Sequence, residues 1–174
     1  MLTPYIENGE YVPWIASGAV KFLDGFTKKT HTVFEVGAGG STLWLAKRAD
    51  YVISYENNRG WYDTVCICLL DEKCENVDLI YTADGSFPVT PKCDILFIDS
   101  KDMGDRIETA KFLYPCLNVN GILVIDDMET QNRYKRTRDV FGVPDKIFKG
   151  RTLMPESNTE TAIWIKRNAG SPQR

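Results

Sequence analysis

A glycine-rich segment, EVGAGGST at residues 35–42, follows a short apolar run and could bind a charged ligand. Its glycines permit a tight turn and allow a ligand to come close to the backbone. If a helix begins just after the turn, its free backbone N–H groups can hold a carboxylate or a phosphate. The segment is not a dinucleotide fingerprint, because GxGxxG starting at Gly37 requires glycine at position 42, where Thr42 stands. Glu35 is awkward beside a pyrophosphate but suits a ligand with an ammonium or sulfonium charge; the alternative is a tight loop without a ligand.

A second acidic position, Glu56, ends the run YVISYEN. A carboxylate at this distance from the first glycine can accept hydrogen bonds from both hydroxyls of an adenosine ribose. On its own it could equally be a solvated acid at a strand end, and the glycine turn is what favours the ligand. Asp84, in TADGS, could accept from an adenine amino group or could belong to an ordinary Asp-Gly turn.

Two further segments, DILFIDSK and ILVIDD, place acids directly after apolar runs. In a doubly wound sheet these acids face one crevice at the carboxyl ends of neighbouring strands. Asp99 is the first choice for a base or an orienting group, Asp126 is the second, and Lys101 is a further candidate catalytic residue. Together with Asp127 they could instead hold a hard cation such as Mg²⁺, or merely cap helices and keep the crevice solvated.

The elements that must position these residues alternate between short β-branched runs and segments of helical period, as in parallel strands joined by crossover helices. We expect parallel strands at 32–36, 51–55, 77–82, 94–98 and 121–125, followed by an antiparallel hairpin of strands at 146–153 and 161–166. Helices are expected at 12–23, from 41 to about 48 with Ser41 or Thr42 as N-cap, from 57 or 58 onward, at 105–114 and at 130–141.

Length and composition restrict the class of protein. The 174 residues fit one domain over 1–168, with residues 1–30 as an N-terminal helical cap and 169–174 as a flexible tail. The net charge of -3 argues against a nucleic-acid partner. The apolar runs are far shorter than the roughly 20 residues of a membrane span, and no signal pattern is present, so we expect a soluble, cytoplasmic protein. The five cysteines lack CxxC spacing and are expected to be reduced.

An acidic-x-Gly-x-Gly turn after the first strand, an acid after the second and a final hairpin together resemble the class I S-adenosylmethionine (SAM)-dependent methyltransferases. The resemblance extends from about Val33 to Lys166. It implies an α/β fold with a three-layer, Rossmann-like, doubly wound sheet of seven strands in the order 3-2-1-4-5-7-6, the last strand antiparallel. It implies SAM as the cofactor, with the methionine part near the glycine turn, the ribose at Glu56 and the adenine at Asp84. The cofactor-binding residues expected on this basis are Glu35, Gly37, Ala38, Gly39, Gly40, Ser41, Glu56, Asn57, Asp84, Gly85 and Asp99.

The acids after the fourth and fifth strands also resemble, in part, those of the cation-dependent small-molecule O-methyltransferases, such as the catechol and caffeoyl-CoA enzymes. That resemblance implies a divalent cation, Mg²⁺. Two departures leave metal dependence open: Lys101 follows Asp99 at two residues where that group has three, and the glycine turn is shorter.

We therefore expect a SAM-dependent methyltransferase that modifies a hydroxyl of a small molecule, such as a sugar or a hydroxylated metabolite. The sequence IDSK after the fourth strand differs from the Asn/Asp-Pro-Pro-aromatic motif of DNA amino methylation. Two alternatives are a module that binds SAM without transferring a methyl group and a nicotinamide-dependent enzyme. In so short a chain a homodimer contact or a mobile N-terminal segment would have to shield the site. Trp14 could belong to such a segment or pack in the core.

Overall fold

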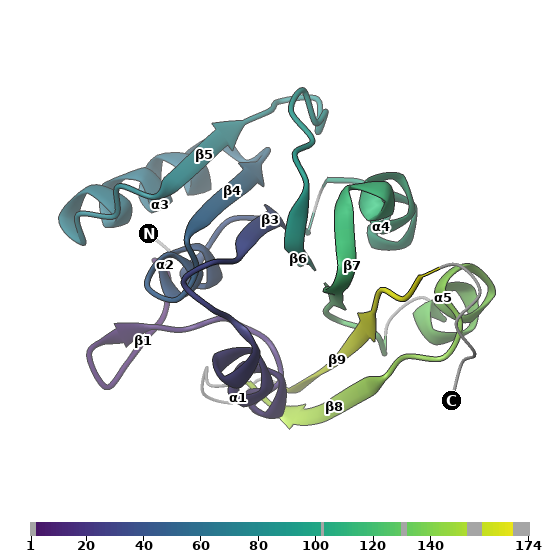
Figure 1. Ribbon diagram of the computed structural model, residues 1–174. Helices are drawn as coiled ribbons and strands as arrows, with labels where there is room; N and C mark the ends of the chain where they lie inside the picture. The colour runs from purple at the N-terminus through teal and green to yellow at the C-terminus, as the bar shows by residue number, and fades with distance from the viewer. Residues whose placement is uncertain (1–2, 102, 130–131, 153–157, 169–174) are drawn as a thin grey trace.

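A seven-stranded sheet forms the centre of the computed structural model, which describes residues 3–101, 103–129, 132–152 and 158–168 (Figure 1). Its strands, in spatial order, are β5 (Val77–Tyr81), β4 (Tyr51–Glu56), β3 (Thr32–Val36), β6 (Cys93–Ile98), β7 (Leu117–Ile125), β9 (Asn158–Ile165) and β8 (Lys146–Arg151). The first five are parallel, and β9 is antiparallel to both of its neighbours. The predicted α/β class, strand order and antiparallel strand are confirmed.

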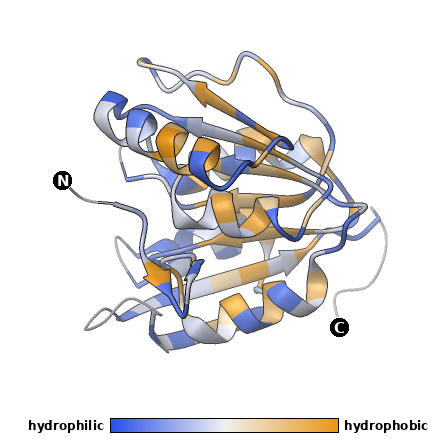
Figure 2. Ribbon diagram, turned by 90° about the vertical axis from the view of Figure 1, so that its left-hand side faces the viewer, coloured by the Kyte–Doolittle hydropathy of each residue, from blue (hydrophilic) through white to orange (hydrophobic). Residues whose placement is uncertain are grey.

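Helices cover both faces of the sheet and make three layers (Figures 1 and 2). One face packs against α1 (Ser17–Phe26) and α2 (Gly40–Ala46), and α3 (Arg59–Asp71) packs beside α2. The other face packs against α4 (Arg106–Leu113) and α5 (Arg133–Phe141). Successive strand residues point to opposite faces, so apolar side chains are buried on both sides of each central strand.

The N-terminal region differs from the predicted helical cap. Instead of a helix from residue 12, the chain forms a small hairpin of β1 (Ile6–Glu7) and β2 (Glu10–Tyr11). Asn8 and Gly9 both have positive φ, 51° and 81°, as a two-residue Asn-Gly turn requires. The following residues are not helical, the Ala16 N–H donates to the Thr161 hydroxyl, and α1 begins only at residue 17.

Other boundaries shift by a few residues. β7 begins four residues before the predicted start, and a register irregularity opposite Cys93 accommodates the extra length. β9 begins three residues early, at Asn158. The N-cap of α2 is Gly39, not Ser41 or Thr42, and the Thr42 hydroxyl accepts a hydrogen bond from the Gly39 N–H. The predicted start of the last helix, Thr130, lies outside the described residues, and α5 begins at Arg133.

Two expectations from composition can be compared with the structure. All five cysteines are free thiols, as predicted. Among the described residues, no helix combines the length and the apolar character that crossing a membrane requires.

Candidate active site

A cleft of about 590 Å³ opens at the carboxyl ends of β3, β4, β6 and β7. This volume lies within the range of small-molecule and cofactor sites. The residues that line the cleft come from the glycine turn, the ends of the strands and the N-terminal segment. They are Trp14, Gly37, Ala38, Gly39, Gly40, Ser41, Glu56, Asn57, Asn58, Trp61, Asp99, Ser100, Lys101, Arg106, Asp126 and Asp127.

The glycines of the turn serve three different purposes. Gly37 has a φ of +95°, and a Cβ there would lie 2.7 Å from the Ser100 backbone. A Cβ at Gly40 would lie 2.4 Å from the carbonyl oxygen of Val12, because the N-terminal segment crosses the turn at this point. Gly39 is extended, and a Cβ there would meet only the Trp61 ring, at 3.7 Å. Gly37 and Gly40 are therefore required by close contacts within the protein. At Gly39 the absence of a side chain leaves space for a ligand.

Glu35 holds the glycine turn in shape through a network of hydrogen bonds. Its Oε2 accepts hydrogen bonds from the hydroxyls of Thr42 and Ser54, each at 2.5 Å. The Thr42 oxygen in turn accepts from the Gly39 N–H at 2.9 Å. Glu35 is fully buried and is not among the residues that line the cleft, so its contacts fix the turn's shape. Thr42, which breaks the dinucleotide fingerprint, is the link in this network.

Burial raises the pKa of Glu35 to about 7, against 4.5 for an ordinary glutamate. The unfolded chain therefore releases this proton at a lower pH than the folded chain does. As pH rises from about 4.5 to about 7, the free energy of unfolding is expected to fall by about 3 kcal/mol through this group. Urea unfolding of the wild type and of Glu35→Gln across this range measures the effect. The variant should lose the part of the slope that Glu35 contributes, while the part that comes from the raised pKa values of the buried Asp99 and Asp126 remains. A parallel pair of curves would contradict the prediction.

Glu56 joins the end of β4 to the glycine turn. Its carboxylate accepts hydrogen bonds from three backbone N–H groups, those of Ala38 at 3.2 Å, Asn57 at 2.9 Å and Asn58 at 2.7 Å. The carboxylate is thus held in one orientation at the edge of the cleft.

Two tryptophans form an aromatic wall beside this carboxylate. The Trp61 Nε1–H donates to the Ala38 carbonyl at 2.6 Å. Its ring lies 6.0 Å from that of Trp14, at an interplanar angle of 45°. Trp14 thus belongs to the N-terminal segment and to the wall of the cleft.

Three carboxylates gather on the opposite side of the cleft. Oxygens of Asp99, Asp126 and Asp127 lie within 4.8 Å of one another. The Arg106 guanidinium reaches into this group, with Nη1 2.9 Å from Asp99 and Nη2 2.8 Å from Asp127. Asp126 accepts hydrogen bonds from the hydroxyls of Thr159 and Thr161 of β9.

Burial raises the pKa values of two acids of this group. For Asp99, burial and the charge of Asp127 raise the pKa and Arg106 lowers it, which leaves the pKa at about 7. Burial also raises the pKa of Asp126 well above its ordinary range, and the charge of Asp99 adds to the effect. Near neutral pH, Asp99 therefore lies close to its titration point.

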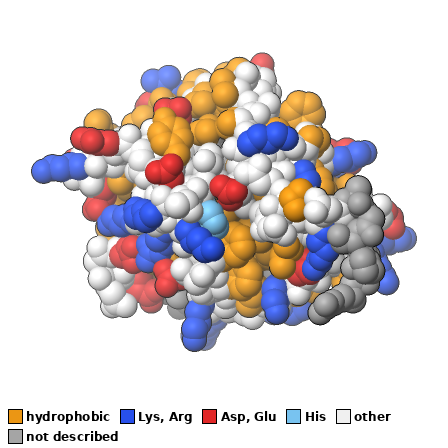
Figure 3. Space-filling model, in the orientation of Figure 1, with side chains coloured by type: hydrophobic (Ala, Val, Ile, Leu, Met, Phe, Trp, Pro, Cys, Tyr) orange, Lys and Arg blue, Asp and Glu red, His pale blue; other side chains and the backbone are white. Residues whose placement is uncertain are grey.

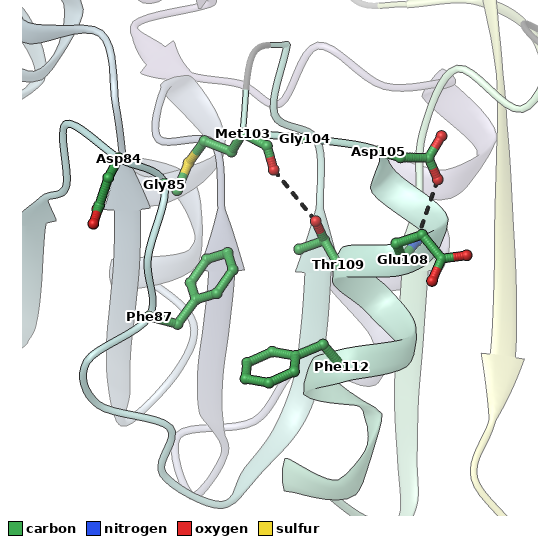
Figure 4. A pocket seen from close by; sticks show the side chains of 9 residues that line it. All are labelled: Asp84, Gly85, Phe87, Met103, Gly104, Asp105, Glu108, Thr109 and Phe112. Carbon is green, nitrogen blue, oxygen red and sulfur yellow. Dashed lines mark hydrogen bonds between the residues drawn. The ribbon is translucent and has the colours of Figure 1, made fainter.

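Asp84 and Gly85, expected at the adenine, line a second pocket of about 360 Å³ on the other side of the loop between β6 and α4 (Figure 4). Asp84 accepts from the Ser86 N–H at 3.0 Å, which is an ordinary turn contact. The rest of this pocket is formed by Phe87, Met103, Gly104, Asp105, Glu108, Thr109 and Phe112. The adenine contact of Asp84 stays a prediction.

The remaining candidates lie together at the larger cleft, except Glu35, which is buried next to the turn. The rim of the cleft carries the exposed side chain of Lys101. Four of the lining residues were not recognised in the sequence as site residues. Asn58 and Trp61 were assigned only to a helix, Ser100 lies between two candidates, and Arg106 belongs to no motif. The sequence gives one signal for Arg106. It is a basic residue at the start of a helix, and the strand before that helix is followed directly by an acid.

Comparison with solved structures identifies the class of fold. An rRNA methylase from Streptococcus thermophilus superposes with a TM-score of 0.67 at 18% identity, covering 84% of this chain and 93% of that chain. A precorrin 8w decarboxylase from Methanobacterium thermoautotrophicum gives 0.68 at 20% identity, covering 95% and 99%. The protein SMU.1697c from Streptococcus mutans, solved in complex with S-adenosylhomocysteine (SAH), gives 0.62 at 15% identity, covering 82% and 92%.

These matches, with the sheet order and the cleft at the strand ends, define the chain's fold as the Rossmann-like fold of class I SAM-dependent methyltransferases. No protein-family model matches the chain, and no curated protein matches it in sequence. The partial resemblance to the cation-dependent O-methyltransferases is not confirmed.

One expectation about partners is wrong. The net charge argued against nucleic acid, yet an rRNA methylase shares this fold over most of both chains. Net charge is an average over the whole surface, and it carries no information about the groups around one cleft.

Proposed function

We propose that the protein is a SAM-dependent methyltransferase whose cleft binds SAM between the glycine turn and Glu56. One observation carries the proposal: the Ala38 N–H bonds to the Glu56 carboxylate, so the turn and the ribose-binding acid form a single unit. In this unit Gly39 leaves room for a ligand and Trp61 provides an apolar wall. The same cleft carries a carboxylate, Asp99, on its far side.

Ser100 supports the presence of a ligand. Only 4% of its surface is exposed, and its hydroxyl has no hydrogen-bond partner among the described residues. A buried hydroxyl without a partner is costly, so a polar atom of a ligand in the cleft would satisfy it. The residues present therefore fit a polar, positively charged nucleoside such as SAM, whose bound form supplies an electrophilic methyl group.

The acid side of the cleft suits transfer to a hydroxyl oxygen. As the oxygen bonds to the methyl carbon and the carbon–sulfur bond breaks, the hydroxyl proton needs an acceptor. Asp99 is placed at the cleft, and its raised pKa, about 7, makes it able to take a proton near neutral pH. Arg106 holds the Asp99 carboxylate in position at 2.9 Å.

We infer a hydroxylated acceptor, either a small molecule such as a sugar or a hydroxyl group on RNA. On the face drawn in Figure 3, basic and acidic side chains are interspersed, so charge on this face favours neither kind of acceptor. A screen of hydroxylated metabolites and of RNA, which detects SAH release from SAM, separates the two. The absence of any binding heat with SAM or SAH in calorimetry would refute the proposed function.

Gly39→Ala tests the cofactor cleft directly. The new methyl group would enter the ligand's space without straining the fold, because its contacts are ordinary and the backbone is extended. We expect SAH affinity to fall by about tenfold or more, a loss of about 1.4 kcal/mol, with an unchanged melting temperature. Calorimetric titration with SAH, and with NAD as a comparison ligand, measures the change.

The matched control is Gly25→Ala. A Cβ at Gly25, in α1, meets nothing within 4 Å. Its SAH affinity should equal that of the wild type. Equal affinities in both variants would place the ligand elsewhere than at Gly39.

A further inference from the structure

Arg106 occupies the centre of the acid cluster formed by Asp99, Asp126 and Asp127. Its Nη1 and Nη2 contact Asp99 and Asp127 at 2.9 and 2.8 Å, and its Nε donates to the Ser100 carbonyl at 2.8 Å. Only 5% of the residue is exposed. Three contacts in different directions therefore fix the guanidinium plane between the ends of β6 and β7.

The same three carboxylates have the donor type and spacing of a divalent-cation site. A bound Mg²⁺ would need oxygens at about 2.0 to 2.1 Å. The space beside Asp99 and Asp127 is filled by guanidinium nitrogens in direct contact with both. The ion and the side chain cannot share this position, so the residues present do not fit a metal.

The position of Arg106 in its own helix is unfavourable on local grounds. It is the first residue of α4, where the helix dipole disfavours a positive charge. Burial of a group that stays ionised adds a desolvation cost. The two ion pairs, with Asp99 and Asp127, offset these costs. The carboxylates of the cluster therefore need a positive charge at the position of Arg106.

We propose that Arg106 is the permanent cation of the acid cluster and stands where a divalent cation would otherwise bind. The chain thereby balances the charge of Asp99 and Asp127 without taking up Mg²⁺ or Mn²⁺. This inference does not depend on the proposed function, because it concerns the charge balance of the cleft in the protein alone.

Titration with Mn²⁺, followed by the electron paramagnetic resonance signal of the free ion, tests the proposal without SAM or an acceptor. The wild type should leave the signal of added Mn²⁺ unchanged at stoichiometric concentrations. Arg106→Ala should bind one Mn²⁺ per chain, at least about tenfold more tightly than the wild type. Arg106→Lys, which keeps a positive charge, should behave as the wild type does.

A second substitution identifies the ligands. Adding Asp127→Asn to Arg106→Ala should weaken the Mn²⁺ site that the single variant gains. Circular dichroism establishes that each variant is folded. Stoichiometric Mn²⁺ binding by the wild type would overturn the proposal, whether or not Arg106→Ala folds. A folded Arg106→Ala that gains no Mn²⁺ would overturn it as well.

Discussion

Replacement of Asp99 by Asn is expected to lower the rate of methyl transfer by about 10² to 10⁴-fold while SAH affinity stays the same. The amide keeps the size of the side chain but cannot accept the proton of the acceptor hydroxyl. SAH is the right ligand for the binding measurement because it lacks the sulfonium charge that a carboxylate attracts. A lower rate of methyl transfer with an unchanged SAH affinity therefore indicates that Asp99 acts as a base and not as a binding group.

The pH dependence of the rate gives a second measurement of the same role. Because the pKa of Asp99 is raised to about 7, the wild-type rate should increase as pH rises through about 7 and then level off. In Asp99→Asn the residual rate should lack this increase.

Asp94→Asn is the control, since Asp94 lies on β6 at the opposite end from the cleft and accepts bonds from the Thr32 N–H and the Asn118 amide. Its rate should match that of the wild type. An unchanged rate in Asp99→Asn would refute the role of Asp99. A wild type that binds SAH but is inert with every acceptor would favour a SAM-binding module.

Arg106→Met is expected to lower the free energy of unfolding by about 2 to 4 kcal/mol. The substitution keeps an apolar stem but leaves Asp99 and Asp127 without the guanidinium that contacts both of them. The value lies at the lower end for buried pairs, because the Asp127 side chain is 39% exposed and water screens part of the repulsion. Urea unfolding at a slightly alkaline pH, where Asp99 is ionised, measures the loss.

Arg136→Met serves as the comparison for this loss. Arg136 pairs with Asp105 at 2.7 Å, but its side chain is exposed, so the loss should be much smaller than that of Arg106→Met. Combining Arg106→Met with Asp99→Asn should restore part of the stability. Equal losses in the two single variants would show that the Arg106 pairs are no stronger than a surface contact.

The sheet could be predicted from the sequence because its information is local. β3 lies at residues 32–36 in the prediction and in the structure, and the acids after the strands meet at one edge because parallel strands share that edge. The unbroken apolar run at residues 121–125 is typical of a central strand buried on both faces, which the two helix layers explain.

The predicted N-terminal helix is present, but it begins at Ser17 instead of residue 12. The helical period from Val12 to Leu23 correctly identified residues that are buried, including Ile15 and Ala19. It did not show that residues 12–16 are not helical, because an amphipathic pattern records burial and not backbone shape. Pro13 and the Asn-Gly pair at residues 8 and 9 were the local signals for a different structure.

The arrangement within the site could be predicted less well than the fold. Asp99, Asp126 and Glu56 could be chosen because each follows a strand. Arg106 could not, because its role depends on carboxylates from two strands that only the folded sheet brings together. Glu35 was expected beside the ligand, and only the hydroxyls of Thr42 and Ser54 reveal that it fixes the turn.

Val12 crosses over Gly40, and Trp14 lines the cleft. These two contacts limit how far the chain can be shortened from its N-terminal side. A fragment that starts at β3, the border that the strand pattern alone would suggest, would lack one side of the cavity. It would also expose the apolar surface that α1 covers. The smallest unit that keeps this cleft complete must therefore include the residues from Val12 onward.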